Sequence, residues 1–315
     1  MRALLRPALA LVAVGAVAGV LVAARPGGTV GASEEATEGL AVRSAGRWVT
    51  FWRPGTAPSW RAGARPLAER LAWRAGADGI EWGELVLRGA REAWRTRVVV
   101  ARLDPRSVEL SLAPAFATDQ RWTIVEADDA ALALDAGQFR GSLPWGWVVT
   151  GGHEILSPQY APLAGAVVVD STGAVRVIPP DAVAAERARG TAREAFQSFP
   201  MLLQDGAVPA PLSEAGRGVN VLHRDARLAL GTTDDGQVVV ALTRFDALGE
   251  SLGRIPFGLT SEEMAAVMSA LGCRQALLLD GGISGQLMVR DAGGSVRSWP
   301  GTRSVPMGLI GRTRR

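Results

Sequence analysis

The stretch TSEEMAAVMSALGCRQALLLDGG, residues 260–282, contains the clearest passage from helix to strand in the chain. Thr260 is followed three residues later by Glu263, the pair that forms a capping box at a helix N-terminus. Apolar side chains then recur at helical spacing at Met264, Val267, Met268 and Leu271. Gly272 is a typical helix end. The spacing therefore predicts a helix between Thr260 and Gly272.

A strand follows this helix directly. Residues 275–279 are nearly all apolar, which is typical of a strand buried on both faces, and Asp280-Gly281-Gly282 come next. Such a strand would hold the acid rigidly, while the glycines let a ligand approach the backbone closely. Asp280 is therefore the first candidate for catalysis, and the N–H groups of both glycines are candidates for contact with an anion. The alternative is a carboxylate that only accepts hydrogen bonds inside a turn.

Outward from this segment, strand-like runs dominate the chain. Two hairpins are predicted, one over residues 166–178 and one over residues 228–242. Further strands are expected at residues 80–87, 97–103, 108–112, 285–289, 296–299 and 305–310. A second helix is expected over residues 181–196. This order predicts an α+β fold, with mixed or antiparallel β-sheets flanked by a few helices in a single catalytic-type domain.

The composition excludes several classes of function. The chain has 315 residues, 48% of them hydrophobic, with 34 basic and 31 acidic residues and a net charge of +3. No lysine occurs, which excludes a Schiff base or a Walker P-loop. One cysteine and two histidines exclude an internal disulfide and a Cys/His zinc site. We expect no cofactor and no nucleic-acid partner, and a divalent metal with oxygen ligands stays compatible with the composition.

The N-terminus has the pattern of an export signal. Basic residues precede an uncharged apolar run that ends near residue 24, so residues 1–24 are interpreted as a signal peptide or a membrane anchor. Residues 25–47 are interpreted as a linker and 48–315 as the functional domain, in which 48–76 stay unassigned. This predicts an exported protein, periplasmic or extracellular, whose only contact with a membrane is the N-terminal segment.

A second acid at the end of an apolar stretch and a pair of arginines are further candidates for the site. Asp135 also ends an apolar stretch and is followed by Ala136 and Gly137, although a plain strand end is the alternative. Arg224 and Arg227 lie beside His223, and an arginine fork suits a phosphate or carboxylate, although a surface ion pair is the alternative for either arginine.

Two further patterns concern sugars and serine chemistry. Trp145 and Trp147 are candidates for stacking on a sugar, with a place in the core as the alternative. Gly282-Ile283-Ser284-Gly285-Gln286 approaches a nucleophile elbow, but glutamine stands where that motif needs glycine and no histidine follows. A serine hydrolase is therefore a weak third hypothesis.

Four motifs taken together resemble the phosphodiester glycosidase family. They are Asp135-Ala136-Gly137-Gln138-Phe139, Phe199-Pro200-Met201-Leu202-Leu203-Gln204-Asp205-Gly206, Arg227-Leu228-Ala229-Leu230-Gly231 and Leu279-Asp280-Gly281-Gly282. The resemblance extends over about residues 82–311. That family includes enzymes that remove N-acetylglucosamine from a phosphodiester, along with bacterial relatives associated with the envelope and with exopolysaccharide.

The resemblance implies a set of site residues. Catalytic roles fall on Asp280, Asp135 and Arg227. Substrate-binding roles fall on Gly281, Gly282, Ser284, Gly137, Asp205, His223 and Arg224. The chain departs from the family pattern at Asp135, Leu228, Arg244 and Ile283, where asparagine, threonine, an Asp-Gly pair and glycine are usual.

The resemblance implies an exported hydrolase that cleaves the bond between a sugar C1 oxygen and phosphate in an envelope or exopolysaccharide glycan. In that mechanism Arg227 would bind the departing phosphate, and Asp280 would stabilise the sugar cation or activate water. Asp135 would be a second carboxylate. The alternative, which the departures at Leu228, Arg244 and Ile283 favour, is a non-catalytic envelope protein that binds glycan or phosphoglycan with the same cleft.

Overall fold

In the computed structural model, the helix and strand predicted from residues 260–282 are both present. Helix α4 (Ser261–Ala270) begins after Thr260, whose side chain accepts the N–H of Glu263, and the Glu263 carboxylate accepts the N–H of Thr260 in return. This confirms the capping box. Gly272 has a φ of 96°, which ends the helix, and β18 (Cys273–Leu279) follows at once.

The structure describes residues 39–55, 66–89, 95–213, 220, 223–246 and 255–314. All of them belong to one compact unit, residues 36–315. The predicted leader, residues 1–24, lies outside the described residues, and so does most of the predicted linker. Among the helices that the structure describes, none has both the length and the apolar character needed to cross a membrane.

The largest sheet among the described residues is antiparallel throughout and has nine strands. Its order is β15 (Met201–Leu203), β18, β16 (Leu228–Thr233), β17 (Val238–Phe245), β5 (Arg95–Leu103), β4 (Ile80–Arg88), β1 (Leu40–Ser44) and β2 (Arg47–Trp52), with β3 (Arg74–Ala75) paired to β4. The predicted hairpin over residues 228–242 is confirmed as β16 and β17.

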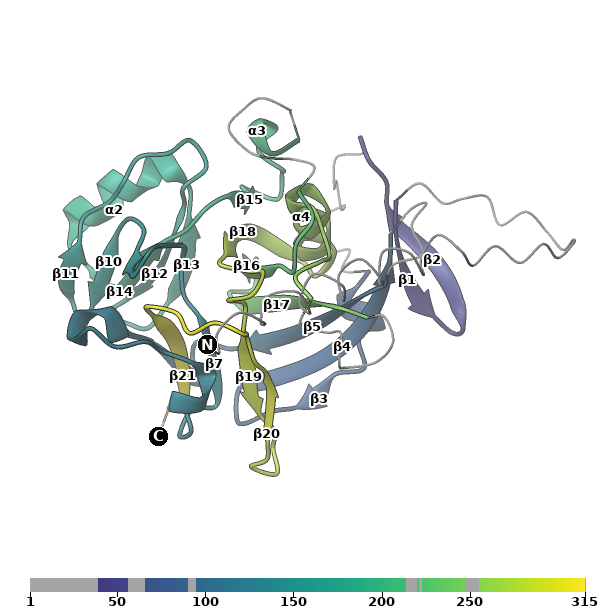
Figure 1. The fold of residues 1–315 in the computed structure, drawn as a ribbon, viewed down its shortest axis with the longest axis horizontal. Helices are drawn as coiled ribbons and strands as arrows, with labels where there is room; N and C mark the ends of the chain where they lie inside the picture. The colour runs from purple at the N-terminus through teal and green to yellow at the C-terminus, as the bar shows by residue number, and fades with distance from the viewer. Residues whose placement is uncertain are drawn as a thin grey trace, which may run out of the picture. The chain divides into compact units, whose positions relative to one another are not determined.

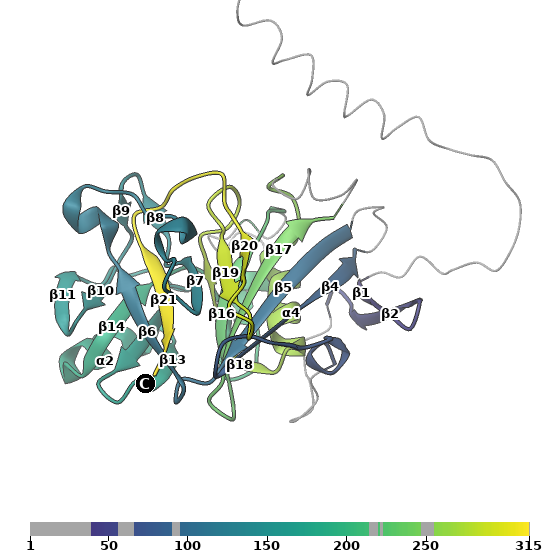
Figure 2. The same cartoon turned by 90° about the horizontal axis from the view of Figure 1, so that it is seen from below.

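Two smaller antiparallel sheets pack beside the large one (Figures 1 and 2). The first has the order β11 (His153–Leu156), β10 (Val148–Thr150), β14 (Ala192–Gln197), β12 (Ala166–Asp170) and β13 (Val175–Ile178). The second has the order β20 (Val296–Trp299), β19 (Leu287–Arg290), β7 (Leu132–Asp135), β21 (Gly308–Thr313) and β6 (Val108–Ala113). A short hairpin joins β8 (Phe139–Arg140) to β9 (Leu143–Pro144).

Helices are few and short in the described part of the chain. Besides α4 they are α2 (Val183–Arg189), α3 (Ala210–Ser213) and the 3-10 turns Ala68–Arg70, Ala115–Thr118, Ile124–Glu126 and Pro180–Ala182. The fold is thus a single domain of mostly antiparallel sheets with a few short helices, which confirms the predicted fold class. The predicted alternative of mixed sheets resolves to antiparallel ones.

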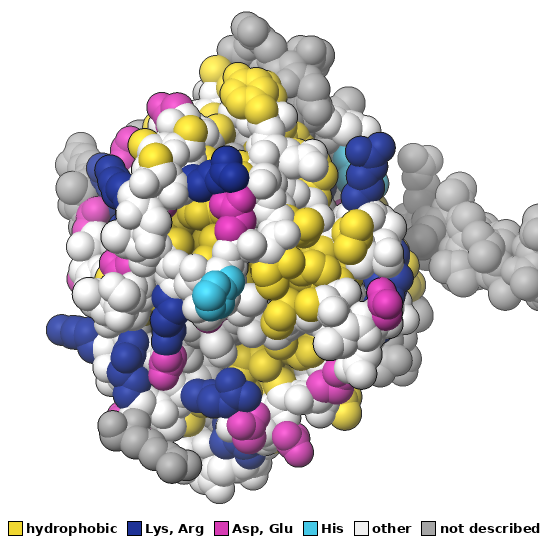
Figure 3. Space-filling model, turned by 90° about the vertical axis from the view of Figure 1, so that its left-hand side faces the viewer, with side chains coloured by type: hydrophobic (Ala, Val, Ile, Leu, Met, Phe, Trp, Pro, Cys, Tyr) yellow, Lys and Arg dark blue, Asp and Glu magenta, His cyan; other side chains and the backbone are white. Residues whose placement is uncertain are grey.

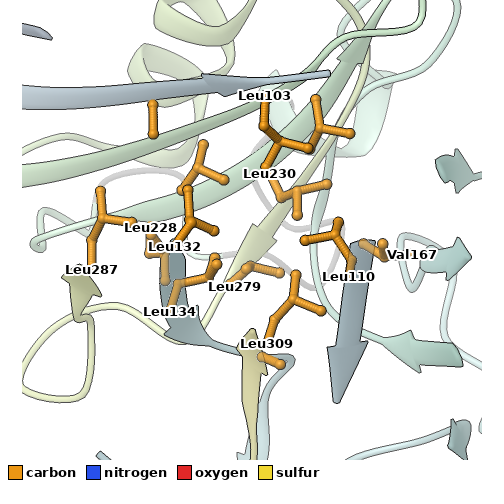
Figure 4. Packing of buried hydrophobic residues seen from close by; sticks show 14 of the residues in the cluster. Leu103, Leu110, Leu132, Leu134, Val167, Leu228, Leu230, Leu279, Leu287 and Leu309 are labelled. Carbon is orange, nitrogen blue, oxygen red and sulfur yellow. The ribbon is translucent and has the colours of Figure 1, made fainter. Parts of the chain in front are cut away.

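Two layers of core lie on the two faces of the large sheet. Successive strand residues point to opposite faces, so Leu277 and Leu279 of β18 join the cluster shared with the two smaller sheets, whereas Leu278 joins the cluster beneath α4. Figure 4 shows the first cluster, in which Leu228 and Leu230 of β16 face Leu132, Leu134, Leu110 and Leu309 from the second small sheet. The strand that leads to Asp280 is therefore covered on both faces.

The structure corrects two predictions. The helix expected over residues 181–196 ends at Arg189, because Gly190 adopts a left-handed conformation, and residues 192–197 form β14 between β10 and β12. Pairing with two strands outweighs the helical propensity of this alanine-rich segment. The linker predicted up to residue 47 ends earlier, because Leu40–Ser44 form β1 and pair with β4.

Charged side chains of both signs are interspersed on the face that carries α2 and β11 (Figure 3). Arg187 of α2 forms two hydrogen bonds with the Glu154 carboxylate, and Arg176 pairs with Glu186. The exposed Arg187–Glu154 pair contributes little to stability. Glu186 is buried, and its pairing with Arg176 and Arg189 compensates the carboxylate for the loss of water.

Candidate active site

Asp280 and the turn after β7 meet although they are far apart in the sequence. Asp280 follows the last residue of β18, and its backbone N–H donates to the carbonyl oxygen of Gly137 at 2.8 Å. Gly137 has a φ of 86°, a conformation that favours glycine. This bond joins strand ends from two different sheets. Both acid-and-glycine motifs found in the sequence therefore belong to one place.

The glycines after Asp280 are required by close approach of the chain. The N–H of Gly282 donates to the carbonyl oxygen of Ala226 at 2.7 Å, and a Cβ at position 281 would overlap that same oxygen. Gly282 itself has a φ of 56°. Its N–H is thus used inside the fold, whereas the sequence suggested that it faces a bound anion. The tight turn presses Asp280 against the segment that carries Arg227.

Asp280 is half-buried in a mixed electrostatic environment. Burial raises the pKa of its carboxyl group above the usual value, and the negative charge of Asp225 adds to this. A hydrogen bond from the buried Ser284 hydroxyl and the positive charge of Arg303 act in the opposite direction, because both favour the carboxylate. Ser284 therefore serves as a donor to Asp280.

Asp135, at the end of β7, is fully buried with an exposed fraction of 0%. Its Oδ1 accepts the backbone N–H of Gln286 at 2.9 Å, whereas its Oδ2 is buried without a hydrogen-bond partner among the described residues. Burial, and then the charge of Asp280, raise the pKa of Asp135 well above its usual value, against the weaker effects of the Gln286 N–H and Arg244. Asp135 thus lies behind Asp280 and out of reach of solvent.

Backbone carbonyls hold the guanidinium of Arg227 in place. Its Nε donates to the carbonyl of Leu259 at 2.9 Å and its Nη2 to that of His223 at 2.6 Å. Burial lowers the pKa of Arg227, while Asp225 and Glu263 oppose that shift. Arginine stays protonated in proteins, so a fixed positive charge lies in the wall of the site.

A pocket of about 550 Å³ opens beside these groups. Its polar lining includes Arg227, His223 and Gln138, and its apolar lining includes Trp145, Phe139 and Leu278. The size is within the usual range for small-ligand sites. Trp147, the other tryptophan considered for sugar stacking, lies in the core with its Nε1–H donated to Glu154.

Of the other predicted residues, His223 belongs to the pocket lining, whereas Arg224 and Asp205 do not. His223 is exposed, with its Nε2 3.5 Å from the Asp225 carboxylate. Arg224 forms a two-pronged ion pair with Glu263, at 2.7 and 2.9 Å. Asp205 accepts a hydrogen bond from Gln275 near the start of β18, about five residues or roughly 16 Å of strand from Asp280.

Sequence reasoning missed Asp225 and Arg303 as members of the site. Asp225 stands between Arg224 and Arg227 in the sequence, and its carboxylate lies near His223 and acts on Asp280. Arg303 has no motif, because it reaches Asp280 from a loop near the C-terminus. Among the described residues, no group of three or more His, Cys, Asp and Glu side chains is arranged to hold a metal ion.

Comparison with known proteins gives one family match. A sequence model of the phosphodiester glycosidase family matches residues 125–310, which is more than half of the chain and includes Asp135, Arg227 and Asp280. No curated protein matches the chain significantly.

Solved structures share the fold at low sequence identity. The catalytic domain of zebrafish N-acetylglucosamine-1-phosphodiester alpha-N-acetylglucosaminidase, auto-inhibited by its pro-peptide, superposes with a TM-score of 0.57 and 15% identity over 83% of this chain and 95% of that one. A hypothetical protein from Synechocystis superposes with a TM-score of 0.49 and 15% identity, over 75% of this chain and 62% of that one. A protein from Burkholderia pseudomallei superposes with a TM-score of 0.45 and 17% identity, over 72% of this chain and 76% of that one.

Proposed function

The chain belongs to the phosphodiester glycosidase family, and on that premise we propose that it hydrolyses the bond between the anomeric carbon of a sugar and a phosphate oxygen. The observation that carries the proposal is the joint position of Asp280 and Arg227. Their backbones are tied together by the hydrogen bond from Gly282 to Ala226, and Arg227 lines the 550 Å³ pocket. Asp280 is not part of the pocket lining itself; it follows Leu279, which pairs with Leu228 next to Arg227. A carboxylate so close to a fixed cation suits a substrate that separates positive from negative charge.

The chemistry passes through a transition state in which the sugar resembles an oxocarbenium ion. A phosphate ester leaves readily, because the monoester product has a second pKa of about 6. The site therefore needs less help from a general acid than an ordinary glycosidase does. We assign Asp280 to stabilise the positive charge on the sugar or to activate the attacking water.

Arg227 is assigned to the departing phosphate. Its guanidinium is oriented before substrate arrives, because the carbonyls of Leu259 and His223 fix it. Preorganised charge of this kind costs no reorganisation at the moment of reaction. His223, exposed on the lining of the same pocket, is placed to add a further donor to the phosphate.

Trp145 and Phe139 are assigned to the organic part of the substrate. Both line the pocket, and the backbone N–H of Trp145 donates to the Gln138 carbonyl oxygen at 2.8 Å. Aromatic faces suit the apolar faces of sugar rings. Gln138, whose amide donates to the Phe199 carbonyl, is held at the pocket wall with its position fixed.

We propose that the protein acts outside the cytoplasm on a cell-envelope or exopolysaccharide glycan. The support is the apolar N-terminal run behind two arginines, which is typical of an export signal or a membrane anchor. Any contact with the membrane would then be made by that segment alone.

A binding protein with a degenerate site is the second candidate. The observation that favours it is the side chain of Arg244, which inserts beneath the Asp280 turn and donates to the carbonyl of Gly285 at 2.6 Å and to that of Trp299 at 3.1 Å. Such a protein would bind the same phosphoglycans without releasing product.

The deciding experiment measures sugar release from a panel of sugar-1-phosphodiesters, beginning with N-acetylglucosamine, by the purified full chain. Asp280→Asn is the matched control, because it keeps the shape of the side chain and removes its charge. Release that disappears in the variant supports the hydrolase. Binding of the same compounds without release, measured by calorimetry, supports the binding protein.

A further inference from the structure

Asp135 and Asp280 form a pair of carboxyl groups with unequal surroundings. Two neighbouring carboxylates repel each other, so the pKa of one member of the pair is raised and that member holds a proton more readily. Asp280 acts on Asp135 through its charge. Their hydrogen bonds and their burial differ in ways that decide which carboxyl group is protonated.

The donors favour charge on Asp280. Asp280 is half-buried and receives the hydroxyl of Ser284 and the field of Arg303, both of which stabilise a carboxylate. Asp135 is fully buried, and its donors are neutral backbone N–H groups, that of Gln286 and its own, while Oδ2 has no hydrogen-bond partner among the described residues. An ionised carboxylate with one oxygen unpartnered in the interior is costly, whereas a neutral acid costs much less.

Arg244 is the cation on the other side of Asp135. Its guanidinium donates to the backbone carbonyls of Gly285, Trp299 and Pro300, at 2.6, 3.1 and 3.3 Å, so its geometry is set by the backbone. The cross-strand neighbours of β7, which come from β19 and β21, include Leu287 opposite Leu134 and Gly308 opposite Asp135 and carry no charge. Asp280 and Arg244 are therefore the charges that act on Asp135 from the surrounding described elements.

We propose that Asp135 carries the proton of this pair and is a positioning residue, so that the negative charge of the site resides on Asp280 alone. The neutral acid keeps its hydrogen bond from Gln286, whose own side chain accepts the N–H of Ile124 at 3.0 Å. This chain of bonds fixes the start of β19 and the turn that bears Asp280. The proposal rests on the proposed function only in giving Asp280 the role of the catalytic carboxylate.

Infrared spectroscopy tests the protonation without any substrate. A protonated carboxyl group absorbs apart from carboxylates, so the full chain at pH 7 is compared with Asp135→Asn and Asp280→Asn. All three carry Glu262→Gln, because burial also raises the pKa of Glu262. We expect the acid band in the parent and in Asp280→Asn, and its loss in Asp135→Asn.

Two results would overturn the proposal, namely absence of the band from the parent and loss of the band in Asp280→Asn alone. If Asp135→Asn does not fold, the parent and Asp280→Asn still decide between these outcomes. Where turnover is measurable, a positioning role predicts that Asp135→Asn keeps kcat within about tenfold and moves the alkaline limit of the pH profile upward. A spectrum as expected without turnover in any chain would count against the hydrolase and leave the protonation standing.

Discussion

The Asp135 turn and the Asp280 turn share one sequence pattern and differ in everything around it. Both acids end an apolar strand, and both precede a glycine with positive φ, Gly137 in one turn and Gly282 in the other. Yet Asp135 is fully buried with only neutral backbone donors, whereas Asp280 is half-buried beside a hydroxyl and an arginine. The difference teaches that a local motif places a carboxylate, while distant neighbours decide its charge.

Charge removal gives the largest expected contrast between the two turns. Asp280→Asn should lower kcat by about 10³-fold, or roughly 4 kcal/mol, because the stabilising carboxylate is lost while the side-chain shape remains. Asp135→Asn should lose much less, since a neutral acid is replaced by a neutral amide. Single-turnover rates on a sugar-1-phosphodiester measure both. Equal losses would erase the contrast that the two environments imply.

A second contrast concerns the residue directly after each acid. Ala136 stands in the first turn, whereas the second needs Gly281 because the Ala226 carbonyl crosses there. Gly281→Ala, which makes the two turns alike in sequence, should lower the free energy of unfolding by about 1–3 kcal/mol and reduce turnover. Chemical denaturation measures the first effect.

Gly293→Ala is the matched control for that substitution. Gly293 lies in the turn between β19 and β20, where an added Cβ meets its nearest neighbour at an ordinary 3.4 Å. A loss at Gly293 as large as that at Gly281 would mean that the crowding by Ala226 is not the cause.

The dependence of stability on pH separates the two acids further. Because the pKa of Asp135 is raised in the folded protein, the fold favours the neutral acid. The contribution of Asp135 to the free energy of unfolding is therefore fully present below the unfolded pKa of about 3.9, and it is lost as the pH rises through the folded pKa. Asp135→Asn removes this titration, so the stability of the parent relative to the variant should fall from acid to neutral pH.

Urea unfolding at several pH values measures that fall. Asp280→Asn should show the same sign with a smaller amplitude, because Ser284 and Arg303 offset the burial of Asp280. Each unit of raised pKa corresponds to about 1.4 kcal/mol. A larger amplitude for Asp280 than for Asp135 would reverse the assignment of the more strongly perturbed group.

Much of the fold could be predicted from the sequence, because many of its helices and strands are determined by patterns of neighbouring residues. The capping box at Thr260, the apolar strand before Asp280 and both hairpins needed only neighbouring residues to be recognised. The strand at residues 192–197 was missed because its two partner strands, not its own alanines and glutamate, determine its conformation. Secondary structure is least predictable where pairing across the chain overrides propensity.

Short motifs predict three of the proposed site residues, Asp280, Asp135 and Arg227, and the family match covers all three. Asp225 and Arg303, and the burial and charge of every member, have no such local signal. The donor that binds Asp135 lies 151 residues away at Gln286, and the pairing of Arg224 with Glu263 spans 39 residues. No local pattern carries such contacts, so burial and charge emerged only from the fold.

The smallest expected effect concerns substrate binding by the residues that follow the Asp135 turn, as distinct from the chemistry proposed for Asp280. Trp145 follows the Asp135 turn on the β8–β9 hairpin and lines the pocket, so Trp145→Ala should raise KM by about 3- to 10-fold and leave kcat nearly constant. Trp147→Phe is the control, because Trp147 is buried and should affect stability without changing KM. Steady-state kinetics separate the two parameters. A fall in kcat for Trp145→Ala would show that both turns contribute to the chemical step, because a side chain that only binds substrate acts on the ground state and the transition state alike.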